Sequence, residues 1–185
     1  MTGADMETFF TSPCLVVVDV QQRLLAAMDD TQNLVDRCSR LIRGAKLLHM
    51  PLCFFDQNPQ GLGPVLPELR LLASDAPLFT KQHFGGHRHT EFRNWLAENH
   101  IMDILICGIE AHVCVAQTAM GLAGDGFRVH VAMDGVSSRK PADKEAGLLR
   151  MQAFGVFPAC VEGLLFEAMG RADVPEFKDF LEIVK

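Results

Sequence analysis

Short apolar runs alternate with amphipathic stripes along the chain. The run at 15–20 (LVVVDV) is apolar except for one carboxylate, which is typical of a strand buried on both faces. From Thr31 to about His49, apolar side chains recur at helical spacing. The same pattern predicts strands at 15–20, 52–55, 78–81, 103–107, 127–132 and 156–161. It predicts helices at 31–49, 67–72, from Thr90, at 112–123, at 141–154 and over the rest of the chain to Val184.

This alternation predicts an α/β fold. Strands joined by helices form right-handed crossovers, and they build a parallel sheet covered by helices on both faces. We expect a three-layer α/β/α sandwich with six strands in the order 3-2-1-4-5-6. The first and fourth strands then lie side by side, and ligands bind beyond their carboxyl ends. The segment at 56–67 holds three prolines and two glycines and is expected to be a loop.

Length and charge narrow the class of protein. The 185 residues suit one domain, expected over 1–185. The net charge of −6 and the lack of a basic stripe argue against nucleic-acid binding. No apolar run approaches membrane-spanning length, and no export signal is visible, so we expect a cytoplasmic protein that does not bind membranes. The six cysteines are then expected to be reduced.

Cys114 stands where a buried strand gives way to a helix, in GIEAHVCV (108–115). A thiol in the first turn of a helix faces free backbone N–H groups, which are expected to lower its pKa and can also hold an oxyanion. A nucleophile of this kind suits acyl transfer. The alternative is an inert cysteine of the core.

Asp19 and Lys81 end two other predicted strands. Asp19 would act as a general base, or alternatively as a helix cap. Lys81 would stabilise thiolate and carboxylate together, or alternatively lie solvated at the surface.

Three segments in this order resemble the signatures of the isochorismatase-like cysteine hydrolases: VVVDVQ (16–21), TKQHFG (80–85) and GIEAHVCV. The resemblance covers essentially the whole chain. A Q-x-P-x-G-L-G segment (57–63) and the tail at 164–180 further resemble a short subfamily.

The resemblance implies a catalytic triad of Asp19, Lys81 and Cys114. It also implies a cis peptide between Ile109 and Glu110, with the backbone N–H groups of Glu110 and Cys114 as the oxyanion hole. The substrate would be a small molecule with an amide or carbamoyl C–N bond. Side chains expected to line its pocket are Gln22, Gln57, Phe84 and His112.

No metal or other cofactor is expected. Relatives that act on nicotinamide carry a metal-binding D-x-H pair, whereas this chain has Asp56-Gln57-Asn58. The histidines of the following loop, at 83, 87 and 89, are expected to be polar loop residues and not metal ligands.

Other functions stay open at this stage. The fold could serve a binding or scaffold protein without catalysis, or Cys114 could be a redox-active thiol. Hydrolysis of a vinyl ether is a further enzymatic alternative, but it needs no thiolate. A homo-oligomer is expected from the resemblance and from apolar residues of the terminal helices, namely Phe166, Met169 and Phe177.

Overall fold

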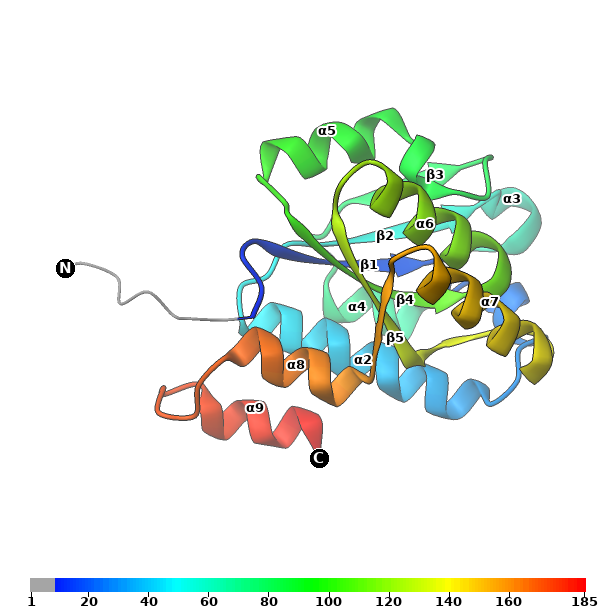
Figure 1. The fold of residues 1–185 in the computed structure, drawn as a ribbon. Helices are drawn as coiled ribbons and strands as arrows, with labels where there is room; N and C mark the ends of the chain where they lie inside the picture. Colours follow the sequence, from blue (N-terminus) through cyan, green and yellow to red (C-terminus); the bar gives the residue numbers. More distant parts are fainter. Residues whose placement is uncertain (1–8) are drawn as a thin grey trace.

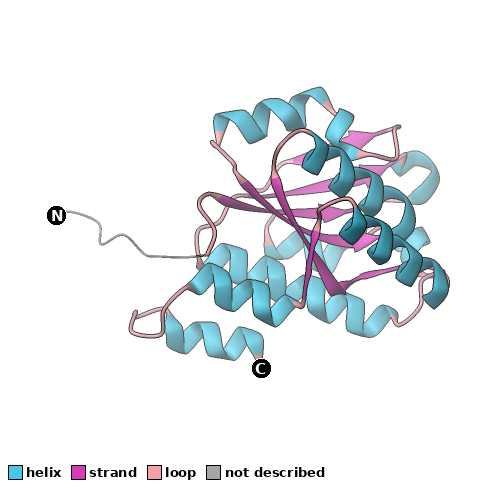
Figure 2. Cartoon of the chain, in the orientation of Figure 1, coloured by secondary structure: helices cyan, strands magenta, loops and turns pink. Residues whose placement is uncertain are grey.

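The computed structural model describes residues 9–185, and the first eight residues of the expected domain lie outside this range. Its centre is a six-stranded sheet in the order β3-β2-β1-β4-β5-β6, in which every pair of neighbours is parallel (Figures 1 and 2). This confirms the predicted fold class and strand order. The strands are β1 (Pro13–Val18), β2 (Leu52–Gln57), β3 (Leu78–Lys81), β4 (Asp103–Ile109), β5 (Arg128–Ser137) and β6 (Phe157–Ala159).

Helices cover both faces of this sheet (Figure 1). One layer holds α2 (Thr31–Leu47), α4 (Pro67–Leu72), α8 (Val161–Met169) and α9 (Phe177–Val184), and the other holds α5 (Thr90–Glu98), α6 (Ala116–Gly124) and α7 (Pro141–Ala153). Strand β1 shows how one run of apolar residues serves both layers. Leu15 and Val17 pack toward the first layer, and Val16 and Val18 toward the second, because successive side chains of a strand point to opposite faces.

Element boundaries differ from the sequence prediction in several places. β1 ends at Val18, two residues early, because Asp19 takes a left-handed backbone conformation with φ of 53°. β2 continues through Asp56 and Gln57, which pair with Thr80 and Lys81 of β3. The predicted loop at 56–67 also contains the short helix α3 (Pro59–Leu62), and another short helix, α1 (Gln22–Leu25), lies before α2.

The later strands differ as well. β5 runs to Ser137, well beyond the predicted end, whereas β6 keeps only Phe157–Ala159 of the predicted 156–161. Between β4 and α6 lies a π-helical turn, Ala111–Val115, in place of the regular helix expected from His112. A turn of this type is wider than an α-helix and is frequent at functional sites.

Gly108 allows β4 to lie close to β1 just before this turn. Its φ is +127°, and a Cβ atom there would stand 2.0 Å from the backbone oxygen of Val18. Only glycine fits a position that is both in the positive-φ region and this near a neighbouring strand. The chain therefore reaches the π-helical turn by a path that no other residue allows.

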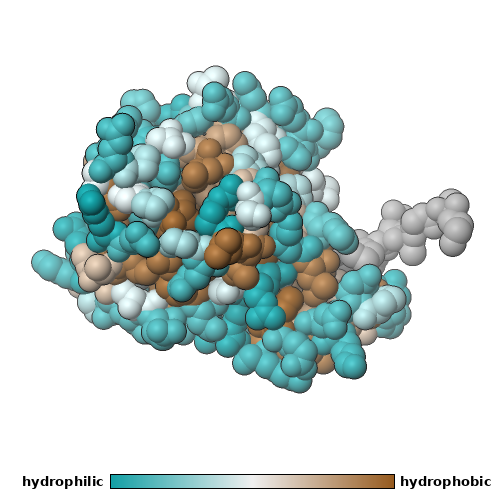
Figure 3. Space-filling model, turned by 180° about the vertical axis from the view of Figure 1, so that it is seen from behind, coloured by the Kyte–Doolittle hydropathy of each residue, from teal (hydrophilic) through white to brown (hydrophobic). Residues whose placement is uncertain are grey.

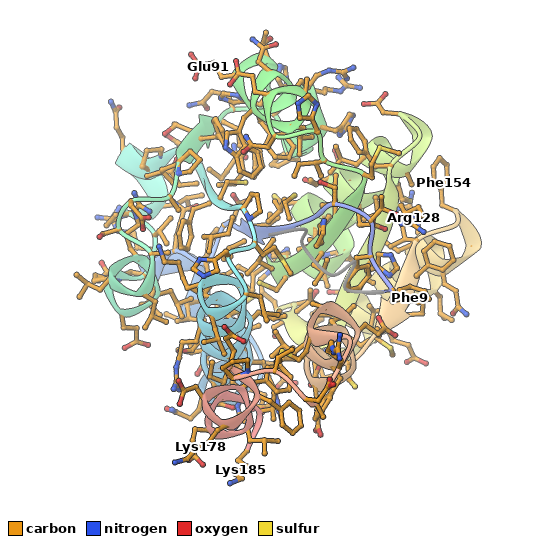
Figure 4. All side chains as sticks on the ribbon, turned by 90° about the vertical axis from the view of Figure 1, so that its left-hand side faces the viewer. Phe9, Glu91, Arg128, Phe154, Lys178 and Lys185 are labelled. Carbon is orange, nitrogen blue, oxygen red and sulfur yellow. The ribbon has the colours of Figure 1, made fainter. Side chains whose placement is uncertain are left out.

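An ion pair between the buried Asp103 and the half-exposed Arg128 lies at the opposite, amino-terminal edge of the sheet. Asp103 is fully buried, and its Oδ2 accepts a hydrogen bond from Nη2 of Arg128 at 2.8 Å and one from the backbone N–H of Thr11 at 2.9 Å. Figure 4 looks onto this edge and shows Arg128 near Phe9. The contacts fix the start of the described chain against β4 and β5.

Apolar side chains are not confined to the core. On the face turned away from the viewer of Figure 1, they form a band surrounded by hydrophilic residues (Figure 3). Among residues 9–185, no helix is long and apolar enough to cross a membrane.

Candidate functional site

Three chain segments bring charged and nucleophilic groups to the carboxyl edge of the sheet. Asp19 directly follows β1, Lys81 ends β3, and Cys114 lies in the turn after β4. The ammonium Nζ of Lys81 stands 2.6 Å from Oδ2 of Asp19, and both side chains are almost completely buried. The fold thus joins residues that are 62 positions apart in the sequence.

This ion pair rules out the two alternative roles considered for its members, namely a helix cap for Asp19 and a solvated surface position for Lys81. The short helix after β1 has no side-chain cap, so Asp19 is not a capping residue. Lys81 is 3% exposed and is not a solvated surface lysine. A buried ion pair of this kind adds little net stability, because removing two charges from water costs about as much as their attraction returns.

Cys114 belongs to the apolar cluster beneath α6 but keeps some contact with solvent, with 7% exposure. Burial, and next the negative charge of Asp19, raise the pKa of Cys114 to about 12, while Lys81 acts in the opposite direction. The expectation of a lowered pKa was wrong. The position in the turn is as predicted, but loss of hydration and a close carboxylate outweigh the favourable backbone field.

The carboxyl group of Asp19 is correspondingly basic. Burial raises the pKa of Asp19, and its interactions with Lys81 and with the thiol of Cys114 oppose this rise. Oxygen Oδ1 of Asp19 is buried and has no hydrogen-bond partner of ordinary geometry in residues 9–185. One oxygen of the carboxylate is thus occupied by Lys81, and the other is free to act on the thiol.

Gln57 is a second hydrogen-bond partner of the Lys81 ammonium group. Its Oε1 accepts a hydrogen bond from Nζ of Lys81 at 2.9 Å, and its Nε2 donates to the backbone oxygen of Gln82 at 3.0 Å. Gln57 was expected to line the substrate pocket, but in this structure both ends of its side chain are held by protein groups.

Gln21, which sequence reasoning missed, is fully buried beside it. Its amide accepts a hydrogen bond from the backbone N–H of Gln57 at 2.8 Å and donates to the backbone oxygen of Gln57 at 3.1 Å. The only signal in the sequence was a polar residue directly after a buried strand. That signal does not separate Gln21 from its exposed neighbour Gln22.

The turn that carries Cys114 begins with a cis peptide bond between Ile109 and Glu110. The backbone oxygen of Glu110 accepts hydrogen bonds from the N–H groups of Val113 and Val115. The Glu110 carboxylate lies 3.0 Å from Nε of Arg139, which connects this turn to the segment before α7.

The remaining residues expected at the pocket contact other groups or solvent. Nδ1 of His112 is 3.0 Å from Oγ of Ser138. Gln22 is exposed at the start of α1, and Phe84 is 54% exposed in the loop after β3. Their positions suit the rim of a site, and neither the Gln22 nor the Phe84 side chain forms a hydrogen bond or ion pair with Asp19 or Lys81.

The histidines after β3 point to different neighbours. His83 is exposed, the ring of His87 lies against Gly121 of α6, and Nδ1 of His89 accepts a hydrogen bond from Phe92 at the start of α5. In the part of the chain that the structure describes, no three His, Cys, Asp or Glu side chains are grouped so that they could hold a metal ion. All six cysteines are free, and Cys160 is the exposed one.

The fold and this site define a class: parallel α/β proteins with a buried acid, amine and thiol at the carboxyl edge of the central strands. The sequence model of the isochorismatase domain matches residues 13–162. The chain belongs to the isochorismatase family.

Named relatives agree with this membership. Isochorismatase domain-containing protein 2 of Xenopus laevis is 33% identical over 173 residues, which cover 94% of this chain and 83% of that protein. The MAR1 ribonuclease of Caenorhabditis elegans has 30% identity and a TM-score of 0.89, and the match covers 94% of this chain and 90% of that one. YcaC of Escherichia coli, described as an octameric hydrolase of unknown specificity, shares the fold with a TM-score of 0.88, 21% identity and coverage of 95% and 90%.

Proposed function

We propose that this protein is a cysteine-dependent hydrolase that cleaves a C–N bond of a small amide or carbamoyl compound. The observation that carries the proposal is the buried Asp19–Lys81 pair with the Cys114 thiol against it. A scaffold protein would gain little from such a pair, because isolated charges are costly to bury. Perturbed titratable groups at a strand edge are instead common where chemistry occurs.

Nucleophilic attack begins in this proposal with a proton transfer. The resting thiol is protonated, since the pKa of Cys114 is about 12. Asp19, whose pKa is raised by burial, accepts the proton as sulfur bonds to the substrate carbonyl carbon. Lys81 stays protonated and stabilises the negative charge on sulfur and on the carboxylate. No preformed thiolate is required.

The tetrahedral intermediate places negative charge on the former carbonyl oxygen. The backbone N–H groups of Glu110 and Cys114 are proposed to stabilise this oxygen. Protonated Asp19 then gives its proton to the departing nitrogen, the C–N bond breaks, and an acyl group remains on Cys114 as a thioester. Water attacks the thioester, Asp19 takes its proton, and Cys114 regains that proton when the acid product leaves.

The other candidate functions have less support. A redox-active cysteine is favoured by a lowered thiol pKa, and here burial raises the pKa of Cys114. Ribonuclease activity, which the name of the C. elegans protein states, would require the phosphate backbone to approach a chain with a net charge of −6. We therefore place amide hydrolysis first.

A screen of small amides and carbamoyl compounds tests the proposal, with ammonia or amine release and the mass of the Cys114 peptide as readouts. A substrate should leave a transient acyl group on Cys114, and Cys114→Ser should lose roughly a thousandfold or more of turnover. Cys160→Ser, at the exposed cysteine, is the matched control and should keep full activity. Turnover that survives in Cys114→Ser would refute the cysteine mechanism.

A further inference from the structure

The Q-x-P-x-G-L-G segment has no role in the proposed function so far. It starts with Gln57 at the end of β2 and continues through the short helix α3 to Gly63. Gln57 is 8% exposed, so little of its surface is open to a ligand. Its side-chain oxygen faces Lys81 and its side-chain nitrogen faces the backbone of Gln82.

Residues that follow β1 hold this segment in place through hydrogen bonds. Gln21 bonds to both the N–H and the backbone oxygen of Gln57, and Arg23 donates to the backbone oxygen of Gly61 at 2.6 Å. The backbone N–H of Asn58 donates to the oxygen of Lys81 at 3.2 Å. Gln57 is thus held rigidly at both its main chain and its side chain.

An ammonium group has three N–H donors. Asp19 and Gln57 take two of those on Lys81, which leaves the third for the thiol of Cys114. We propose that Gln57 is a positioning residue that orients the Lys81 ammonium toward Cys114, and that the Q-x-P-x-G-L-G segment holds it in place. This inference rests on the proposed function and gives Gln57 a role other than contact with substrate.

The test measures the alkylation of Cys114 by iodoacetamide from pH 7 to 10, read from the mass of its peptide. The groups that act on this thiol are Asp19 and Lys81, with Asp56 behind Asp19. Gln57→Met keeps the side-chain volume and removes the acceptor oxygen. Without a fixed ammonium the thiolate is less stable, so alkylation at pH 8 should slow by about tenfold, equivalent to one pKa unit.

Gln82→Met is the matched control, because Gln82 follows Lys81 and has an exposed side chain. It should alkylate like the unsubstituted protein. Equal rates in Gln57→Met and Gln82→Met would overturn the inference, as would a raised KM in Gln57→Met with unchanged alkylation, which indicates substrate contact. Gln57→Ala is a second variant, and failure of both Gln57 variants to fold would assign Gln57 a purely structural role and also overturn it.

The two proposals can fail separately. Alkylation needs no substrate, so the comparison of Gln57→Met with Gln82→Met reports on Lys81 even if Cys114→Ser retains turnover. Conversely, turnover that depends on Cys114 would support the hydrolase mechanism even if Gln57 proves dispensable.

Discussion

At the scale of single residues, the sign of the effect of Asp19 on Cys114 is informative. Asp19 raises the pKa of the thiol, so in the resting protein it suppresses the thiolate. In the proposed reaction the same carboxylate is the base that removes the thiol proton. One residue thus protects the thiol at rest and activates it during attack, and substitution should separate these roles.

Asp19→Asn should make Cys114 more reactive toward iodoacetamide and the enzyme less active. Loss of the negative charge lowers the pKa of Cys114, so alkylation at pH 8 should accelerate several-fold or more. Turnover should fall by about a hundredfold or more, because the proposed general base is missing. Rates of alkylation and of product release, measured on the same preparation, test the predicted increase in alkylation and the predicted decrease in turnover. Parallel loss of both would contradict this account.

At the scale of elements, the site depends on how α7 packs on the π-helical turn. Gly147 faces this turn, and a Cβ atom added there would lie 2.7 Å from Cα of His112 and 2.9 Å from the backbone oxygen of Ala111. These are backbone atoms, which cannot move aside as a flexible side chain does. The helix and the turn therefore fit only while position 147 has no side chain.

Gly147→Ala should displace the turn that carries Cys114. We expect a loss of about 1–3 kcal/mol in the free energy of unfolding, as for other overpacked interiors, together with reduced turnover. Gly124→Ala is the control, because a Cβ atom there meets its nearest neighbour, Cε1 of Phe154, at an ordinary 3.9 Å. That variant should be as stable as the unsubstituted protein or slightly more so. Urea unfolding and turnover of both variants test this prediction. Equal stability of Gly147→Ala and Gly124→Ala would count against the packing argument.

At the scale of the whole molecule, buried thiols connect stability to pH. Burial raises the pKa of Cys14 and of Cys53 above the ordinary value of 9.0. The folded protein keeps these protons at a pH where the unfolded chain loses them. The stabilisation is complete below the unfolded pKa and is lost as pH rises past it toward the folded pKa.

The free energy of unfolding should therefore fall above about pH 9, by roughly 1–3 kcal/mol per pH unit for these two thiols together. Urea titrations at pH 8, 9 and 10 under reducing conditions measure the slope. Cys53→Ala removes one of the two groups and should give a shallower decline. A free energy that stays constant between pH 8 and pH 10 would show that these thiols do not govern the alkaline limit.

Local patterns in the sequence determined the architecture. Runs such as LVVVDV mark strands buried on both faces, and their alternation with helical stripes predicted the parallel sheet, its strand order and the placement of Asp19 and Cys114 at one edge. These features follow from side-chain periodicity and chain connectivity, which are readable along the chain.

Only the tertiary structure decided the chemistry of those groups. Three features depend on which atoms from distant segments surround each group. They are the raised pKa of Cys114, the left-handed backbone conformation of Asp19, and the hydrogen bonds that connect Gln21 to Gln57 and Gln57 to Lys81. Desolvation and Coulomb interactions act through space over a few ångströms, so they have no counterpart in the spacing of residues along the chain.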